Sequence, residues 1–100
     1  MFSKSFFQKT IFLNPDYAES YNNLGICYEK LNDNLNAKKN FVLAIRKNKN
    51  FCEAYKNLGI IYLRENNLLR AVSFLKKSMN FNNCNLYLTQ SNNSNIKNYI

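Results

Sequence analysis

The sequence has 100 residues, of which 46% are hydrophobic, and it carries a formal net charge of +8. A chain of this length can bury one small core, and its two glycines and single proline favour helices joined by short turns over an all-β fold. Three cysteines without a CxxC pair, in a chain with no histidine, exclude the usual zinc sites, and no apolar run reaches the roughly 18 residues of a membrane-spanning helix.

The first segment, residues 1–17, combines apolar and basic residues and has no acid before Asp16. This composition fits either a weak targeting peptide or an amphipathic helix over residues 2–13. Pro15, the only proline of the chain, lies two residues after the end of this candidate helix. The internal repeat described below favours the helix.

Residues 18–51 carry the spacing of two helices. One apolar series advances in steps of three or four residues, as one face of an α-helix does: Tyr21, Leu24, Tyr28 and Leu31. A polar turn cluster follows at residues 32–34, and a second apolar series begins at Ala37. Gly25 lies inside the first helix, where glycine costs about 1 kcal/mol relative to alanine. We therefore expect Gly25 to permit a close approach of the second helix, which carries Ala37.

Residues 52–85 repeat this unit at an offset of 34 residues. The offset carries a block of the first helix (Tyr21, Asn23, Leu24, Gly25, Ile26 and Tyr28) onto Tyr55, Asn57, Leu58, Gly59, Ile60 and Tyr62. Each unit therefore reads as a helix-turn-helix hairpin, with Gly59 in the role of Gly25.

The run from Tyr21 to Tyr28, followed by Ala37, Phe41 and Ala44, resembles the signature of the tetratricopeptide repeat, whose period is 34 residues. The resemblance implies an all-α fold, an α-solenoid of antiparallel helix-turn-helix hairpins with about five helices. Projected back by one period, the end of the first unit falls on Pro15. Residues 1–17 are therefore predicted to hold the second helix of an incomplete preceding repeat, which makes the chain a fragment of a longer array.

Four segments follow from this pattern: 1–17 as the partial repeat, 18–51 as repeat one, 52–85 as repeat two, and 86–100 as a tail. The tail is rich in Asn and Ser and matches no repeat position. Such a composition cannot bury enough apolar surface to offset chain entropy, so the tail is predicted to be disordered.

In tetratricopeptide proteins the first helices of successive hairpins line a concave groove that holds extended peptides. The resemblance and the helical phase together predict a peptide-binding groove formed by Asn22, Asn23, Ile26, Lys30, Lys56, Asn57, Ile60 and Arg64. Acids and bases balance on this face once Glu19, Glu29 and Glu53 are included. Most of the excess positive charge lies on the second helices, where a solvated surface explains it.

Asn23 and Asn57 recur at one offset and are expected to stand one above the other along the groove, where an amide can donate and accept at once. This arrangement resembles the asparagine ladder in the superhelical arm of O-linked N-acetylglucosamine transferases. The chain contains 20 asparagines, which leaves open the alternative that the recurrence has no function.

The sequence thus predicts a cytoplasmic or nuclear protein–protein interaction scaffold that is not an enzyme and has no catalytic residue, metal or cofactor. Its expected partner is a protein or peptide of unknown identity, rather than a nucleic acid or a membrane, and self-association through uncapped ends stays open. Two alternatives also remain: an RNA-associated or acidic-partner module that uses the Lys-rich second helices, and the repeat arm of a larger enzyme such as a glycosyltransferase.

Overall fold

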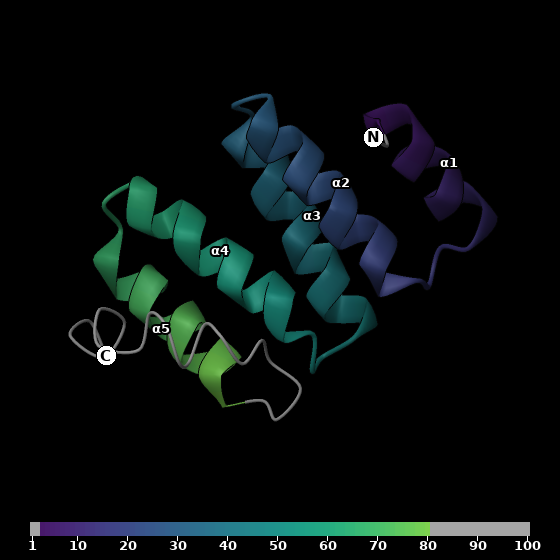
Figure 1. Cartoon of the computed structure of the whole chain (residues 1–100). Helices are drawn as coiled ribbons and strands as arrows, with labels where there is room; N and C mark the ends of the chain where they lie inside the picture. The colour runs from purple at the N-terminus through teal and green to yellow at the C-terminus, as the bar shows by residue number, and fades with distance from the viewer. Residues whose placement is uncertain (1–2, 81–100) are drawn as a thin grey trace.

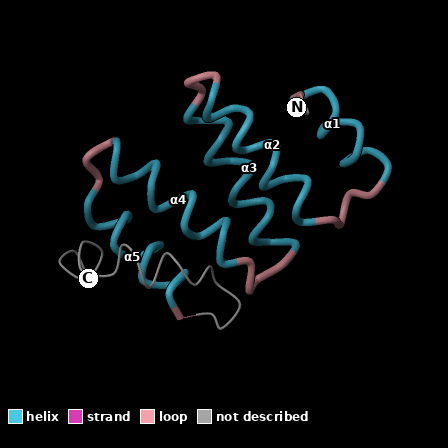
Figure 2. The backbone as a smooth tube through the Cα atoms, in the orientation of Figure 1, coloured by secondary structure: helices cyan, strands magenta, loops and turns pink. Residues whose placement is uncertain are grey.

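The computed structural model describes residues 3–80, which form five α-helices (Figure 1). The helices are α1 (Lys4–Leu13), α2 (Ala18–Lys30), α3 (Asn34–Lys47), α4 (Cys52–Arg64) and α5 (Leu68–Met79). Figure 2 shows that short loops join them, and that α2 with α3 and α4 with α5 form antiparallel hairpins. The hairpins stack through α3 and α4. The structure thus confirms the predicted all-α solenoid, while the predicted tail at 86–100 lies outside the described residues.

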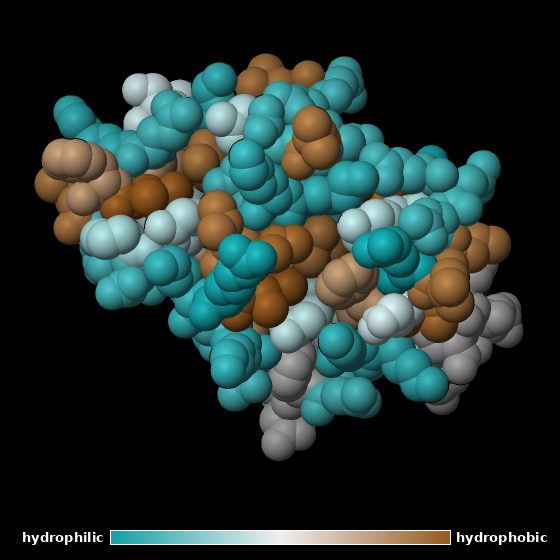
Figure 3. Space-filling model, turned by 180° about the vertical axis from the view of Figure 1, so that it is seen from behind, coloured by the Kyte–Doolittle hydropathy of each residue, from teal (hydrophilic) through white to brown (hydrophobic). Residues whose placement is uncertain are grey.

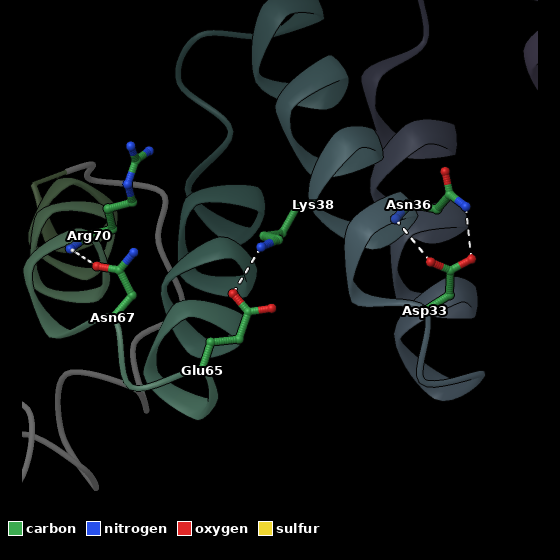
Figure 4. A network of polar contacts seen from close by, with 6 residues as sticks. All are labelled: Asp33, Asn36, Lys38, Glu65, Asn67 and Arg70. Carbon is green, nitrogen blue, oxygen red and sulfur yellow. Dashed lines mark hydrogen bonds and ion pairs between the residues drawn. The ribbon is translucent and has the colours of Figure 1, made fainter.

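The turn inside each hairpin depends on asparagine. Asn32 and Asn66 both have a φ of 61°, in the left-handed region that asparagine adopts more readily than most residues. The next residue caps the second helix: Asp33 accepts a hydrogen bond from the backbone N–H of Asn36, and Asn67 caps α5 in the same way (Figure 4). The same local chemistry therefore reverses the chain and starts the second helix in both hairpins.

Both glycines lie where the two helices of a hairpin come closest. A Cβ atom at Gly25 would lie 2.6 Å from Cε1 of Phe41, and one at Gly59 would lie 2.6 Å from Cγ of Leu75. The expected close approach is confirmed for both hairpins. In each hairpin the atoms nearest the glycine belong to the residue one helical turn beyond the alanine of the second helix, Phe41 after Ala37 and Leu75 after Ala71.

The core consists of two clusters that each join the first hairpin to the second. One cluster contains the buried side chains of Ala37, Phe41, Leu58 and Ile61. The other contains Tyr21, Ala44 and Ala54. Because α3 and α4 contribute to both clusters, the α3–α4 contact fixes how the hairpins are stacked.

Helix α1 packs on α2 as α3 packs on α4. It also ends like α3. The backbone N–H of Asn14 donates to the carbonyl of Thr10 at 2.9 Å, and the backbone N–H of Asn48 donates to the carbonyl of Ala44 at 2.9 Å. Thr10 and Ala44 are 34 residues apart, which is one repeat period. The hydroxyl of Tyr21 donates to the carbonyl of Pro15 at 2.7 Å, and Tyr55 makes the equivalent bond in the second hairpin. Helix α1 therefore has the geometry of a second helix, and its assignment to a preceding repeat stays a prediction.

Candidate functional site

The first helices, α2 and α4, are joined side by side by two polar contacts. Nδ2 of Asn57 donates to Oδ1 of Asn22 at 3.1 Å, and the guanidinium of Arg64 forms an ion pair with Glu29. In each helix the two residues are seven positions apart, which places them two turns apart on one face. The two contacts therefore align α2 and α4 over most of their length.

This alignment puts two of the predicted groove residues in structural roles. Asn22 is only 2% exposed, and its oxygen is already bonded to Asn57. Asn22 thus supports the α2–α4 face from within and does not line it, a correction to its predicted position. A buried amide requires such a partner, because an unpaired one costs free energy.

The expected stacking of Asn23 and Asn57 along the groove stays a prediction. Asn57 bonds to the residue before Asn23, whereas Asn23 lies half-buried on the α1 side of α2. There it lines a cavity of about 600 Å³ together with Phe6, Phe7, Thr10, Leu13, Asn14, Tyr17 and Ser20. The amide link between neighbouring first helices therefore runs from position 57 to position 22.

The other predicted residues are spread along the two helices. Ile26 is half-buried and packs against the core cluster, and Ile60 and Lys56 are half-buried on α4. Lys30 and Arg64 are exposed at the ends of their helices. Because Arg64 is paired with a carboxylate of α2, the expected balance of charge on this face is partly achieved by direct contact.

The cavity between α1 and α2 was not among the predicted sites. Its polar groups are linked: the hydroxyl of Thr10 donates to that of Ser20 at 3.0 Å, and the hydroxyl of Tyr17 donates to Glu19 at 3.2 Å. That hydrogen bond, with the carboxylate charge, raises the pKa of Tyr17 above its usual value. The 34-residue offset relates Thr10 to Ala44, a buried core residue of α3. This offset is the sequence signal that Thr10 faces a neighbouring helix.

Hydrophobic side chains gather at the end of the molecule that α1 forms (Figure 3). Phe12 is 85% exposed and Leu13 is 75% exposed. Single exposed apolar residues are ordinary on protein surfaces, whereas a group of them indicates contact with another surface.

The described residues form neither a cluster of metal-ligating side chains nor a membrane-spanning helix. Residues 3–80 contain no group of three or more His, Cys, Asp or Glu side chains placed to hold a metal ion. Cys52 is buried and Cys27 is half-buried on α2, where a thiol acts as a small apolar group. None of the five helices is long and apolar enough to cross a membrane.

Comparisons with known proteins agree with this fold. Residues 6–39, a window that runs from α1 to the start of α3, match the family described as tetratricopeptide repeat. The crystal structure of MamA is similar, with 28% sequence identity and a TM-score of 0.73 over 76% of this chain. The match covers 44% of the MamA chain, so this chain spans less than half of its length. No curated protein matches the sequence.

The repeat match over residues 6–39 and the structural similarity to MamA both agree with the predicted tetratricopeptide-type fold. Repeats of this type generally form non-catalytic scaffolds for protein–protein interaction, because stacked hairpins create an extended concave surface. The coarse functional prediction, a scaffold that binds proteins, is supported on the same grounds.

Proposed function

We propose that the chain binds an extended peptide segment of a partner protein along the face shared by α2 and α4. The observation that carries this proposal is the pair of contacts that holds the two helices side by side, Asn57 with Asn22 and Arg64 with Glu29. A surface that is already aligned before binding loses less conformational freedom when a peptide docks.

The side chains available on this face suit a peptide backbone. Ile26 and Ile60 supply half-buried apolar surface on successive helices, and the half-buried Lys56 of α4 supplies donors for a peptide carbonyl. The resemblance to the transferase-type asparagine ladder supports recognition of a peptide backbone. The alternative that the chain is the repeat arm of a larger enzyme, such as a glycosyltransferase, stays open. The compartment we propose is the cytoplasm or nucleus.

The experiment starts from a peptide selected against the chain from a displayed library of random sequences. Titrated into the ¹⁵N-labelled chain, this peptide should shift the amide signals of Ile26, Lys56 and Ile60 most strongly. Ile60→Glu should weaken binding about tenfold, because it places a charge on apolar contact surface. Ser73→Glu is the matched control, since it adds the same charge to an exposed position of α5.

Signal shifts confined to α3 and α5, or equal losses in the two variants, would overturn the proposal. Sedimentation velocity on the free chain runs beside this titration and reports self-association through the exposed Phe12 and Leu13 of α1. A single monomeric species at all concentrations would rule self-association out.

A further inference from the structure

A second groove runs along α3. Its cavity has a volume of about 550 Å³ and is lined by Leu35, Asn36, Lys38, Lys39, Val42, Leu43, Arg46 and Tyr62. Only Tyr62, from α4, comes from a first helix, and no residue of the predicted peptide-binding face lines it. This groove is therefore a different surface from the α2–α4 face that is proposed to bind a peptide.

Apolar and basic side chains alternate along the floor of the groove. Leu35, Lys39, Val42 and Arg46 follow one another at steps of four, three and four residues, so they share one face of α3. Lys39 and Arg46 are seven residues apart, which separates them by about 10 Å along the helix axis. Leu35 is 75% exposed, so apolar surface is accessible beside the two charges.

The opposite wall is built around the ring of Tyr62. The ring of Phe74 stacks on it at 5.7 Å between centroids, and Nζ of Lys38 lies 4.9 Å from its centre. Lys38 also forms an ion pair with Glu65 at 2.9 Å, which ties α3 to the end of α4 (Figure 4). These contacts hold the wall in place and neutralise the charge of Lys38.

Lys39 and Arg46 are both exposed, and neither takes part in an ion pair within residues 3–80. All six acids of the chain lie in this described range. Five of them are engaged elsewhere by ion pairs or hydrogen bonds, and the sixth, Glu53, lies in the first turn of α4. No acidic side chain of residues 3–80 therefore compensates these two charges, and the proposed occupant supplies its own.

We propose that this groove docks an acidic amphipathic helix of a partner protein. The helix carries two carboxylates seven residues apart, which reach Lys39 and Arg46. It also carries one apolar side chain midway between them, which contacts Val42, and a second one turn beyond the carboxylate at Lys39, which contacts Leu35. A second copy of this chain does not fit the description, because none of its acids are seven residues apart. A nucleic acid fits less well, since two unpaired cations of the described groove, with apolar residues between and beside them, offer little to a continuous line of phosphates.

The test uses a fluorescein-labelled, alanine-based helical peptide with two Glu residues seven positions apart, a Leu midway between them and a second Leu four positions outside the Glu that faces Lys39. Fluorescence anisotropy measures its binding to the full chain at low salt. The double variant Lys39→Glu with Arg46→Glu should weaken binding by at least about tenfold. The matched control, Lys9→Glu with Lys76→Glu, changes the net charge equally at exposed sites outside the groove, and should change binding less than about twofold.

Four further measurements test the proposed occupant. Replacing both Glu residues of the peptide by Lys should abolish binding, and Leu35→Ser should weaken it, because the apolar contact is lost. Equal losses in the groove and control variants would overturn the proposal in favour of unspecific charge attraction. Tighter binding of a single-stranded oligouridylate than of the peptide would overturn it in favour of nucleic acid. Ile60→Glu should leave binding unchanged, so this result and the test of the α2–α4 face can fail independently.

Discussion

The two hairpins share one plan but differ in the side chain that fills the space beside the glycine. In α2–α3 the ring of Phe41 lies against Gly25 and is fully buried, whereas in α4–α5 Leu75 lies against Gly59 and remains 7% exposed. Their neighbours differ too. Helices α1 and α4 cover the first hairpin from both sides, while α3 is the main neighbour of the second among the described helices.

This difference shows that the glycine, and not the residue opposite it, defines the hairpin contact. Both an aromatic and an aliphatic side chain fit against a bare backbone at this position, each with its nearest atom 2.6 Å from where a Cβ would lie. The stability that each side chain contributes then depends on how completely its surroundings bury it. We therefore expect the first hairpin to be the more sensitive one to core substitutions.

The largest expected effect is the loss of the Phe41 ring. Phe41→Ala should lower the free energy of unfolding by about 3 to 5 kcal/mol, a large share of the roughly 5 to 15 kcal/mol of a small domain. Leu75→Ala should cost less, because Leu75 lies near the end of the stack. Urea denaturation followed by circular dichroism measures both. Phe12→Ala, at an 85% exposed ring, is the control and should change little; a larger loss at Leu75 than at Phe41 would contradict the comparison.

Alanine at the two glycines sharpens the comparison. Either substitution gains about 1 kcal/mol of helix propensity but places a Cβ within 2.6 Å of a neighbouring atom, and overpacking of this kind costs about 1 to 3 kcal/mol. Gly59→Ala should be the more costly, because the backbone nitrogen of Leu75 also lies at 3.2 Å, so α5 itself must move. At Gly25 the nearest atoms belong to the outer edge of the Phe41 ring. A net gain in thermal stability for either variant would refute the close contact.

The smallest effect distinguishes the two helix caps. Hydrogen bonds from the side chain and backbone of Asn36 lower the pKa of Asp33 below its usual value of 3.8. Its ionised form is thus favoured in the folded state, so its contribution to stability is complete above the usual pKa and disappears as pH falls through the folded value. Asn67 does not titrate. Asn67→Ala should cost about 1 kcal/mol at every pH, whereas Asp33→Ala should destabilise the chain at neutral pH and lose that effect in strong acid.

Thermal unfolding of the two cap variants between pH 2 and pH 7 measures this difference. Asp33→Asn is the matched control, because it keeps a capping oxygen and removes the titration. If Asp33→Ala and Asn67→Ala follow the same pH dependence, the assigned role of the carboxylate is wrong.

Most of the fold could be predicted from the sequence, and less of the site. The offset that carries Gly25 onto Gly59 predicts two hairpins, and the asparagines near residue 32 predict where they turn. The burial of Asn22 was not predictable in this way, because its partner, Asn57, lies 35 positions away on another helix. The helical phase alone placed Asn22 and Asn23 on the same face, although the structure turns one inward and the other toward α1.

The sequence by itself determined the helices, their period and their turns, because apolar spacing, capping and left-handed asparagines act over a few neighbouring residues. Tertiary structure alone decided how the helices are rotated against one another. That rotation selects Asn22 as the partner of Asn57, pairs Arg64 with Glu29, and draws Lys38 to Glu65, leaving Lys39 and Arg46 as the free cations of the α3 groove. Packing at the glycines and across the α3–α4 core sets these rotations, since it joins residues that lie far apart in the chain.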